Sequence, residues 1–496
     1  MTDTSTSLWR EERMFVGGRL VEASDGARFD NVNPATEEVI GTVADGSHPE
    51  MEAAIGAARA AFDETTWSTD ATLRLRCLRQ VHEGLLRHAE ELRGTLVAEV
   101  GCPVLLTYGP QLASPTDGVA WVADLLERYQ WEEDLGVAEP FGRRTHRTIR
   151  REPVGVVGAI TPWNFPMQIN LAKCIPALAA GNTVVLKPAP DTPWAATLLG
   201  RIVAEETDLP SGVLNVVTSS DHLLGQQLAE DPRVDMVSFT GSTVTGRKVM
   251  SVAAHTIKKV FLELGGKSAF IVLDDADVAS AVAGVAFQIT THAGQGCAVT
   301  SRLLLPRSRF DEGLEAVIEA VGSMSYGDPA DPSMMMGPLV SERQRRRVLG
   351  YIETGVAEGA TVALGGGIPP HLPLGYFVEP TVLVNVGRDA TVAHEEIFGP
   401  VLVVQPHDGD DDAVGVANDS IYGLSGAVVG GSIERARAVA RRLRTGTVSV
   451  NGGVYYSPDV PFGGYKQSGV GREMGRAGFE EYLEIKAVAE GAGSGL

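Results

Sequence analysis

The chain has 496 residues, of which 44% are hydrophobic and 21% are charged. This length exceeds what one ordinary core supports, so two or three globular domains are expected, and the composition excludes a disordered or fibrous protein. Acidic residues outnumber basic ones by 63 to 42, and the net charge of −21 argues against nucleic acid and anionic membrane partners.

The N-terminal segment Met1–Arg10 is polar and lacks the apolar core of a signal peptide. No apolar run approaches the roughly 18 residues of a membrane helix. The four cysteines, Cys77, Cys102, Cys174 and Cys297, form no C-x-x-C pair. This pattern supports neither a metal site nor a disulfide framework, and a reducing, cytoplasmic location is expected.

Two segments rich in Ala, Leu and Arg have helical periodicity, Met51–Phe62 and Leu73–Val100. From residue 154, apolar β-rich runs alternate with helical segments. The expected strands are Val154–Ile160, Thr183–Lys187, Val213–Val217, Met236–Thr240 and Lys259–Leu264. The expected helices between the first four of these strands are Ile169–Ala180, Pro193–Glu206 and His222–Glu230. This alternation predicts a doubly wound parallel α/β sheet, with ligands at the carboxyl ends of its strands.

A second alternating series follows and predicts a second α/β domain. Its expected strands are Arg302–Leu305, Val401–Val404, Gly426–Val429 and Gly446–Asn451. Its expected helices are Asp277–His292, Ser341–Glu358 and Ile433–Leu443. The charged segment Trp131–Arg150 interrupts the first series and is interpreted as an exposed hairpin for subunit contacts.

Two residues are candidates for covalent and acid–base chemistry. Cys297 ends the motif GQGC, where glycines let backbone approach a ligand and a thiolate is a strong nucleophile. The alternative is that Cys297 is a small buried hydrophobic residue. Glu263 ends an apolar strand, where burial would raise its pKa toward that of a general base. The alternative for Glu263 is a strand-end acid in a salt bridge.

Further polar groups follow the other strands. Asn164, in TPWNFP, is placed to donate to a developing oxyanion, unless it only shapes a turn between two prolines. Gly241 and Ser242, in FTGS, open a helix that suits a pyrophosphate; without a G-x-G-x-x-G fingerprint, a plain turn is the alternative. Lys187 suits a ribose or phosphate and equally a solvated charge.

A last pair lies in EEIFGP, where Glu396 suits a ribose hydroxyl and Phe398 a flat ring. The alternative is an ordinary charged loop. Taken together, these groups supply a nucleophile, an oxyanion donor, a base and a dinucleotide cradle, all at strand ends or at turns that lead into helices.

The motifs TPWNFP, KPA, FTGS, ELGGKS, GQGC, EEIFGP and PFGGYKQSG occur in the order typical of the aldehyde dehydrogenase superfamily. The chain resembles this superfamily from about Asn31 to about Lys486, nearly its whole length. The resemblance implies a hydrolytic, non-acylating, NAD(P)-dependent enzyme that forms a homodimer or homotetramer. It implies a Rossmann-like cofactor domain, an α/β catalytic domain and a small β oligomerisation element. Their expected ranges are 1–130 with 151–262, then 263–468, and finally 131–150 with 469–496.

The resemblance also implies roles for single residues. Cys297 is the implied nucleophile, Glu263 the base for hydrolysis, and Asn164 the oxyanion donor beside the backbone N–H of Cys297. The implied cofactor-binding residues are Trp163, Lys187, Gly241, Ser242, Glu396 and Phe398. In the implied reaction the thiolate attacks an aldehyde, hydride passes to the nicotinamide, and Glu263 activates water that hydrolyses the thioester.

The cofactor motif departs from the family pattern at one position. Many NAD-preferring members carry an acid three residues after the KPA lysine, and this chain has Pro190 there. Asp191 follows and is the substitute acceptor for the ribose 2′-hydroxyl. No nearby arginine offers a 2′-phosphate site, so NAD is the expected cofactor, with NADP as the alternative.

The residues of the substrate tunnel are placed by their distance in sequence from Asn164, the asparagine of TPWNFP. Its helix would carry Phe165, Ile169 and Ala172, and Tyr455 and Tyr456 would face the same cavity. Ala172 is small where relatives often have a bulky aromatic residue. We therefore expect a medium-sized or bulky hydrophobic aldehyde, whether terpenoid, aromatic or aliphatic.

Two other functions remain open at this point. An acylating dehydrogenase would pass the thioester to coenzyme A, but such relatives usually lack the glutamate base that Glu263 supplies here. A non-catalytic protein on the same scaffold would tend to lose the thiol or the base, and this chain keeps both.

Overall fold

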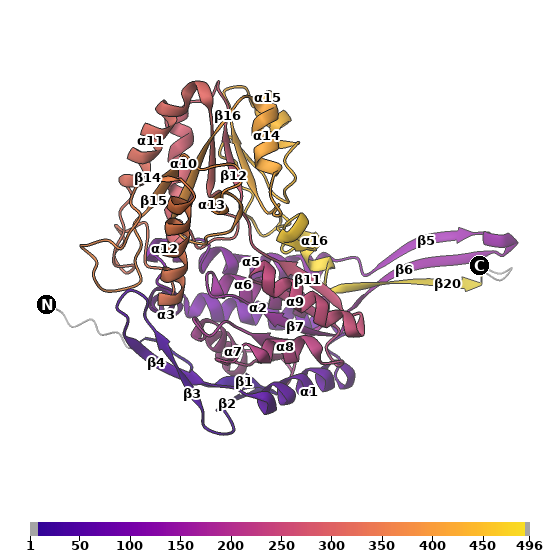
Figure 1. The fold of residues 1–496 in the computed structure, drawn as a ribbon. Helices are drawn as coiled ribbons and strands as arrows, with labels where there is room; N and C mark the ends of the chain where they lie inside the picture. Colours follow the sequence, from indigo (N-terminus) through magenta and orange to yellow (C-terminus); the bar gives the residue numbers. More distant parts are fainter. Residues whose placement is uncertain (1–7, 492–496) are drawn as a thin grey trace.

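The computed structural model describes residues 8–491 and consists of two α/β lobes with a β arm that projects from their side (Figure 1). This mixed α/β architecture is the one expected from the sequence. Within the described residues, no helix combines the length and the apolar character needed to cross a membrane.

The first lobe is built on a sheet whose two faces are both covered. Its strands are β1 (Met14–Val16), β2 (Arg19–Val21), β7 (Val156–Ile160), β8 (Thr183–Lys187), β9 (Leu214–Val216), β10 (Met236–Thr240), β11 (Lys259–Glu263) and β19 (Gly469–Val470). Their order is β19-β11-β10-β7-β8-β9-β1-β2. The pairs among β7, β8, β9, β10 and β11 are parallel. The strands predicted at 183–187 and 236–240 have these bounds in the structure, whereas β1 and β2 were not predicted.

Helices lie on both faces of this sheet. One face is covered by α1 (His48–Glu64), α8 (Leu223–Glu230) and α9 (Thr243–Ala253). The opposite side holds α2 (Ala71–Arg87), α3 (Ala89–Val100), α5 (Ala113–Arg128), α6 (Pro166–Ala180) and α7 (Trp194–Glu206). Side chains alternate between the faces along β8: Val184 and Leu186 pack on one face and Val185 on the other. A strand buried on both faces is apolar at its centre, which is why Val184, Val185 and Leu186 form a continuous apolar run within β8.

The strand order reverses between β7 and β10. From β7 the chain moves outward through β8 and β9, and it then returns to place β10 on the other side of β7. In an open α/β sheet, the crevice at such a reversal, outside the carboxyl ends of the strands, is where ligands bind.

The second lobe has its own sheet. Its strands are β12 (Ala269–Val272), β13 (Arg302–Pro306), β14 (Thr361–Leu364), β15 (Thr381–Val384), β16 (Val401–His407), β17 (Gly426–Val429) and β18 (Ser449–Val450). Their order is β14-β15-β16-β13-β12-β17-β18, and only β14 pairs antiparallel. One face is covered by α10 (Val278–Thr290) and α11 (Phe310–Gly322). The other is covered by α12 (Glu342–Ala357), α13 (Thr391–His394), α14 (Asp410–Asn418) and α15 (Ile433–Ala440).

The arm consists of β5 (Glu132–Ala138), β6 (Thr145–Pro153) and β20 (Leu483–Gly491). The predicted hairpin at 131–150 is therefore present as β5 and β6. Its third strand, β20, comes from the C-terminal region and pairs antiparallel with β6. The pair Gly469–Val470, which we expected within the oligomerisation element, lies in the first sheet beside β11.

Three smaller elements complete the fold. A separate hairpin is formed by β3 (Arg28–Val32) and β4 (Val39–Ala44), and two short helices are α4 (Val104–Thr107) and α16 (Gly475–Glu480). The helix predicted over residues 73–100 is divided at His88, whose backbone (φ −101°, ψ 19°) leaves the helical region.

Candidate active site

The connection between the lobes carries the first candidate group. β11 ends at Glu263 in the first sheet, and β12 begins at Ala269 in the second. Glu263 is 2% exposed, and its Oε1 has no hydrogen-bond partner among the described residues. A methyl group added to Gly266 would lie 2.7 Å from the backbone oxygen of Cys297. Glycine at this position therefore lets the connection pass directly against the cysteine.

The cysteine lies in a turn with unusual backbone geometry. Residues 292–294 all have positive φ values, 49°, 52° and 67°. Such values are uncommon for residues other than glycine, and they occur preferentially at functional sites. The side chain of Gln295 fixes the turn, because its Nε2 donates to His292 O at 3.1 Å and its Oε1 accepts from Val340 N at 3.0 Å. Cys297 follows and is partly exposed, whereas the other three cysteines are buried.

Glu263 and Cys297 are within hydrogen-bonding reach of each other. Burial raises the pKa of Glu263 well above its ordinary value, and the neighbouring Glu473 raises it further. Lys173, which pairs with Glu473 at 3.0 Å, acts in the opposite direction on the pKa of Glu263. Burial also raises the pKa of the Cys297 thiol, and the charge of Glu263 adds to this effect. The two groups form a coupled pair in which one is placed to take the proton of the other.

Asn164 joins this pair through the cysteine turn. It is 4% exposed, and its Nδ2 donates to Gln295 O at 2.8 Å. Its backbone oxygen accepts from Gln111 Nε2 at 2.9 Å. Because an amide nitrogen carries two hydrogens, one remains for a substrate oxygen. The structure thus gathers Asn164, Glu263 and Cys297 around one point. It adds Gln111, which no sequence motif had indicated, and Gln295 of the GQGC motif, to which no role had been assigned.

The crevice at the strand reversal has groups that fit the adenosine end of a dinucleotide. Lys187 ends β8 and is 4% exposed, and its Nζ donates only to the neighbouring Pro188 O at 3.5 Å. Burial lowers the pKa of Lys187 to about 8. Ser242 is the N-cap of α9 and accepts from Thr245 N. A buried amine without an acid in contact fits ribose hydroxyls, and the helix N-terminus fits a pyrophosphate.

The second lobe supplies groups for the other end of such a ligand. Gly266 N donates to Glu396 Oε1 at 2.9 Å, and burial raises the pKa of Glu396 to about 7. Phe398 has φ 64°, and its ring centre lies 5.5 Å from that of Trp163, with the planes at 84°. Phe398 of the second lobe therefore contacts Trp163 of the first lobe, and Glu396 bonds to the connection between the lobes.

The first turns of α12 contribute three side chains that sequence patterns did not indicate. Gln344 Nε2 donates to Phe398 O at 2.7 Å, and Arg347 Nη2 donates to Glu396 O at 2.7 Å. These bonds hold the segment that carries the candidate nicotinamide ligands. Arg343 Nη2 lies 3.7 Å from Asp191 Oδ2. The expectation that no arginine lies near the ribose end of the site is therefore wrong, because α12 belongs to the other lobe and only folding brings it there.

The expected substrate pocket coincides in part with a cavity of about 190 Å³ between α5, α6 and the segments near 456–458 and 474–479. Ala172 and Tyr456 line it. Phe165, Ile169 and Tyr455 are not among its lining residues. The ring of Phe165 packs instead 5.2 Å from that of His292, and Ile169 is buried. Lining residues that the sequence did not suggest include Val119, Trp121, Gln168, Leu171, Ile175 and Met474.

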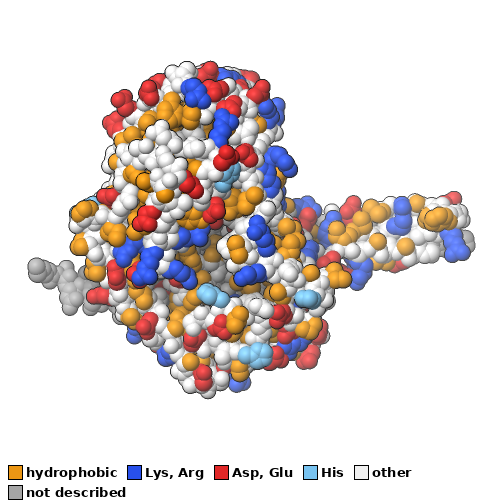
Figure 2. All heavy atoms as spheres, in the orientation of Figure 1, with side chains coloured by type: hydrophobic (Ala, Val, Ile, Leu, Met, Phe, Trp, Pro, Cys, Tyr) orange, Lys and Arg blue, Asp and Glu red, His pale blue; other side chains and the backbone are white. Residues whose placement is uncertain are grey.

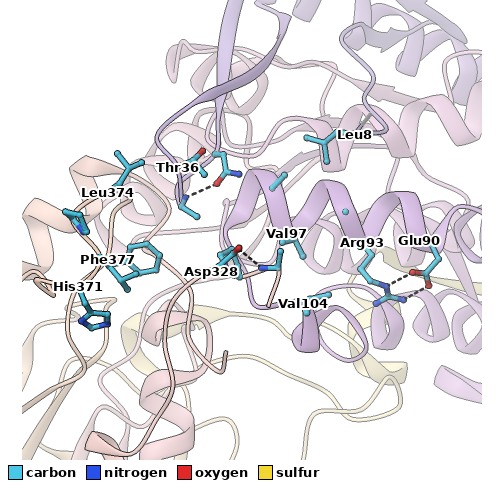
Figure 3. Close-up of a pocket in the computed structure, with 18 residues that line it drawn as sticks. Leu8, Thr36, Glu90, Arg93, Val97, Val104, Asp328, His371, Leu374 and Phe377 are labelled. Carbon is cyan, nitrogen blue, oxygen red and sulfur yellow. Dashed lines mark hydrogen bonds and ion pairs between the residues drawn. The ribbon is translucent and has the colours of Figure 1, made fainter. Parts of the chain in front are cut away.

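A second hollow, of about 650 Å³, is formed by α3 and the loops at 328–330 and 371–374 (Figure 3). Two of its charged groups, Arg93 and Glu90, pair with each other. None of the candidate catalytic or cofactor-binding residues lines it, so it is separate from the site at Cys297.

Comparison with known proteins gives consistent results. The model of the aldehyde dehydrogenase family matches residues 20–488. A 3-succinoylsemialdehyde-pyridine dehydrogenase from a Pseudomonas species is 44% identical, over 97% of this chain and 98% of its own. A crystal structure of betaine aldehyde dehydrogenase from Staphylococcus aureus, in complex with NAD⁺, is 36% identical. It superposes with a TM-score of 0.94 over 98% of this chain and 96% of its own.

Proposed function

Because the chain belongs to the aldehyde dehydrogenase family and is an NAD(P)-dependent aldehyde dehydrogenase, we propose that it forms a thioester on Cys297 and hydrolyses it with Glu263. We further propose that its substrate is a medium-sized or bulky hydrophobic aldehyde and its product the carboxylic acid. The observation that carries the mechanism is the contact between a partly exposed thiol and a buried carboxyl group, with Asn164 bonded to the same turn.

The chain's own residues account for the covalent steps. Cys297 gives up its proton to Glu263 and attacks the aldehyde carbon, and the carbonyl oxygen becomes an oxyanion. Asn164 Nδ2 and the backbone N–H of Cys297 donate to that oxygen. Glu263 releases the proton of Cys297 to solvent, and after oxidation it takes a proton from water, which attacks the thioester and displaces the acid from Cys297. Glu263 then returns its proton to the Cys297 thiolate. A bound nicotinamide dinucleotide supplies the hydride acceptor that the oxidation needs.

We propose that Lys187 holds the adenosine ribose and that Gly241 and Ser242 hold the pyrophosphate. Glu396 then accepts from the nicotinamide ribose, with Phe398 and Trp163 beside the ring. The support is the buried amine of Lys187, which has no acid in contact among the described residues, the N-terminus of α9 at Ser242, and the bond from Gly266 N to Glu396. The structural relative bound to NAD⁺ supports the same cofactor for this chain.

Replacing Asn164 by alanine should slow turnover on the order of a hundredfold, since one oxyanion donor is worth about 3 kcal/mol of barrier. Steady-state kcat with a good aldehyde measures this. Asn215→Ala is a matched control, because it removes another buried amide from β9, a strand that carries no candidate site residue. Asn164 would have no such role if kcat of Asn164→Ala stayed within about threefold of the wild type while thermal unfolding was unchanged.

The hydrophobic substrate is supported by the lining of the 190 Å³ cavity, where Val119, Leu171 and Ile175 surround the small Ala172. The relative from Pseudomonas is named for an aldehyde that carries a pyridine ring, a flat group of the size that such a cavity accepts. A panel of aldehydes with either cofactor tests this part of the proposal. Much better oxidation of small polar semialdehydes than of hydrophobic ones would overturn it.

Filling the cavity should change selectivity. We expect Ala172→Trp to lower kcat/KM for bulky aldehydes roughly tenfold or more, because an indole ring removes the space they occupy. A two- or three-carbon aldehyde serves as the internal control and should be oxidised at nearly the wild-type rate. Equal losses for small and bulky aldehydes would show that Ala172 does not border the bound substrate.

We also propose that the protein forms a homodimer or homotetramer through its arm. The arm exposes Leu135, Val137, Phe141 and Ile485, and apolar side chains are spread along it in Figure 2. Exposed apolar surface on a projecting sheet favours association with another copy. A thiol that must stay reduced for catalysis fits a cytoplasmic location.

A further inference from the structure

An ion pair crosses between the lobes at the end of β8. Arg343 at the start of α12 approaches Asp191, in the loop after Lys187, to 3.7 Å. The Arg343 side chain is 70% exposed and that of Asp191 only 17%. The guanidinium group is therefore mostly open to solvent, whereas the carboxylate is largely enclosed. Figure 2 shows Lys and Arg side chains gathered where α12 meets the first lobe, next to a hollow in the surface.

Asp191 differs from the two other acids near Lys187 in the partner of its carboxylate. Asp45 and Asp221 also act on the pKa of Lys187. Asp45 accepts from the backbone and hydroxyl of Ser220, however, and Asp221 accepts from Leu223 N. The side chain of Asp191 has its ion pair with Arg343 instead. Asp191 is thus the acid near Lys187 whose charge is balanced by a solvent-exposed cation.

From this geometry we propose that Asp191 and Arg343 together recognise the 2′ position of the adenosine ribose, and that Arg343 binds a 2′-phosphate, so that the enzyme accepts NADP⁺ as well as NAD⁺. The inference rests on the proposed cofactor site at Lys187. Pro190, which has no side-chain acceptor, leaves the 2′ position to the next residue, Asp191.

The chemistry of the two groups explains why both cofactors are accepted. A 2′-hydroxyl donates a hydrogen bond, and the carboxylate of Asp191 accepts it. A 2′-phosphate carries close to two negative charges, and an unpaired carboxylate would repel it. Arg343 offsets the charge of Asp191, and its planar guanidinium group matches phosphate with two parallel hydrogen bonds.

Binding of NAD⁺ and NADP⁺ to the intact enzyme, measured by calorimetry without aldehyde, tests the proposal because the two differ only in the 2′-phosphate. We expect wild-type Kd values within about tenfold of each other. Arg343→Ala should weaken NADP⁺ about tenfold or more and NAD⁺ less than threefold, since a hydrogen bond to a charged group is lost. Asp191→Asn should weaken NAD⁺ and leave NADP⁺ unchanged or tighter. Arg346→Ala is the matched control, because Arg346 lies on the same helix, is 74% exposed and pairs with Glu342.

The outcomes separate this proposal from the cofactor site on which it rests. If NAD⁺ binds and NADP⁺ does not, or if Arg343→Ala weakens both equally, the role of Arg343 is wrong and the site at Lys187 stands. If neither dinucleotide binds, the site and the proposal fail together. A selective loss of NADP⁺ binding in Arg343→Ala but not in Arg346→Ala supports the assignment.

Discussion

Cys297→Ala should abolish aldehyde oxidation, with kcat reduced by roughly 10⁴-fold or more, to the background level. The loss is this large because the thiol forms the covalent bond through which every later step passes. The remaining donors at Asn164 and the backbone N–H then have no oxyanion to stabilise. Reduced nicotinamide, followed by absorbance after mixing with aldehyde and NAD⁺ or NADP⁺, measures the effect.

The chain offers a matched control for this variant. Cys77 is a buried cysteine of α2, and Cys77→Ala removes a thiol of similar size without touching the site. Both variants should bind NAD⁺ as the wild type does, which separates lost chemistry from lost folding. Residual oxidation by Cys297→Ala above about a hundredth of the wild-type rate would require another nucleophile and would overturn the thioester mechanism.

Glu263→Gln should lower steady-state turnover by about 10²- to 10⁴-fold, the range for loss of a general base. The Cys297 thiol can also lose its proton to solvent, so the thioester still forms without Glu263, and a burst of reduced cofactor equal to the enzyme concentration should precede the slow phase. Stopped-flow absorbance detects it. Glu99→Gln is the control, because Glu99 is also buried and burial raises its pKa to about 7, yet it contacts Asn31 and the start of α7 rather than Cys297.

The same variant changes how Cys297 titrates. Burial and the charge of Glu263 raise the pKa of the thiol, so the reactive thiolate appears only as pH rises into the alkaline range. Removing the acid removes part of this effect, and the pKa of Cys297 should fall. Alkylation by iodoacetamide, followed by mass spectrometry across pH, should then begin at lower pH in Glu263→Gln. An unchanged or more alkaline profile would contradict the coupling between the two groups.

Local patterns in the sequence predicted the parts of the fold that rest on local physics. The doubly wound sheet followed from apolar runs alternating with helical periodicity, and β8 and β10 have the predicted bounds. The short strands β1 and β2, at one end of the first sheet, escaped prediction because three residues carry no measurable periodicity. Local patterns did not predict β20, and only the family resemblance grouped residues 469–496 with 131–150. β20 pairs with β6, which lies far earlier in the chain, and pairing at that distance leaves no local trace.

The candidate site also has residues that sequence motifs predicted and residues that they did not. Glu263, Asn164 and Cys297 follow strands or turns whose motifs are visible, so the sequence was enough to nominate them. Their supports are of another kind: Gln111 reaches Asn164, and Gln344 reaches Phe398, from segments with no motif of their own. The contact between Arg343 and Asp191 is the clearest example of a contact that the sequence could not predict. The run ERQRRR indicates a charged helix but not the residue that this helix approaches.

The C-terminal segments beside Glu263 are synthesised after the rest of the site, and this order has a consequence for the reaction centre. Gly469 pairs with Glu263, Leu264 N bonds to Ser468 O, and Glu473 lies beside the same carboxyl group. A nascent chain that has emerged only as far as β18 therefore carries Cys297 and Glu263 without the backbone that encloses them. The third strand of the arm, β20, lies later still in the chain, so the residues that enclose Cys297 are synthesised before those that complete the arm.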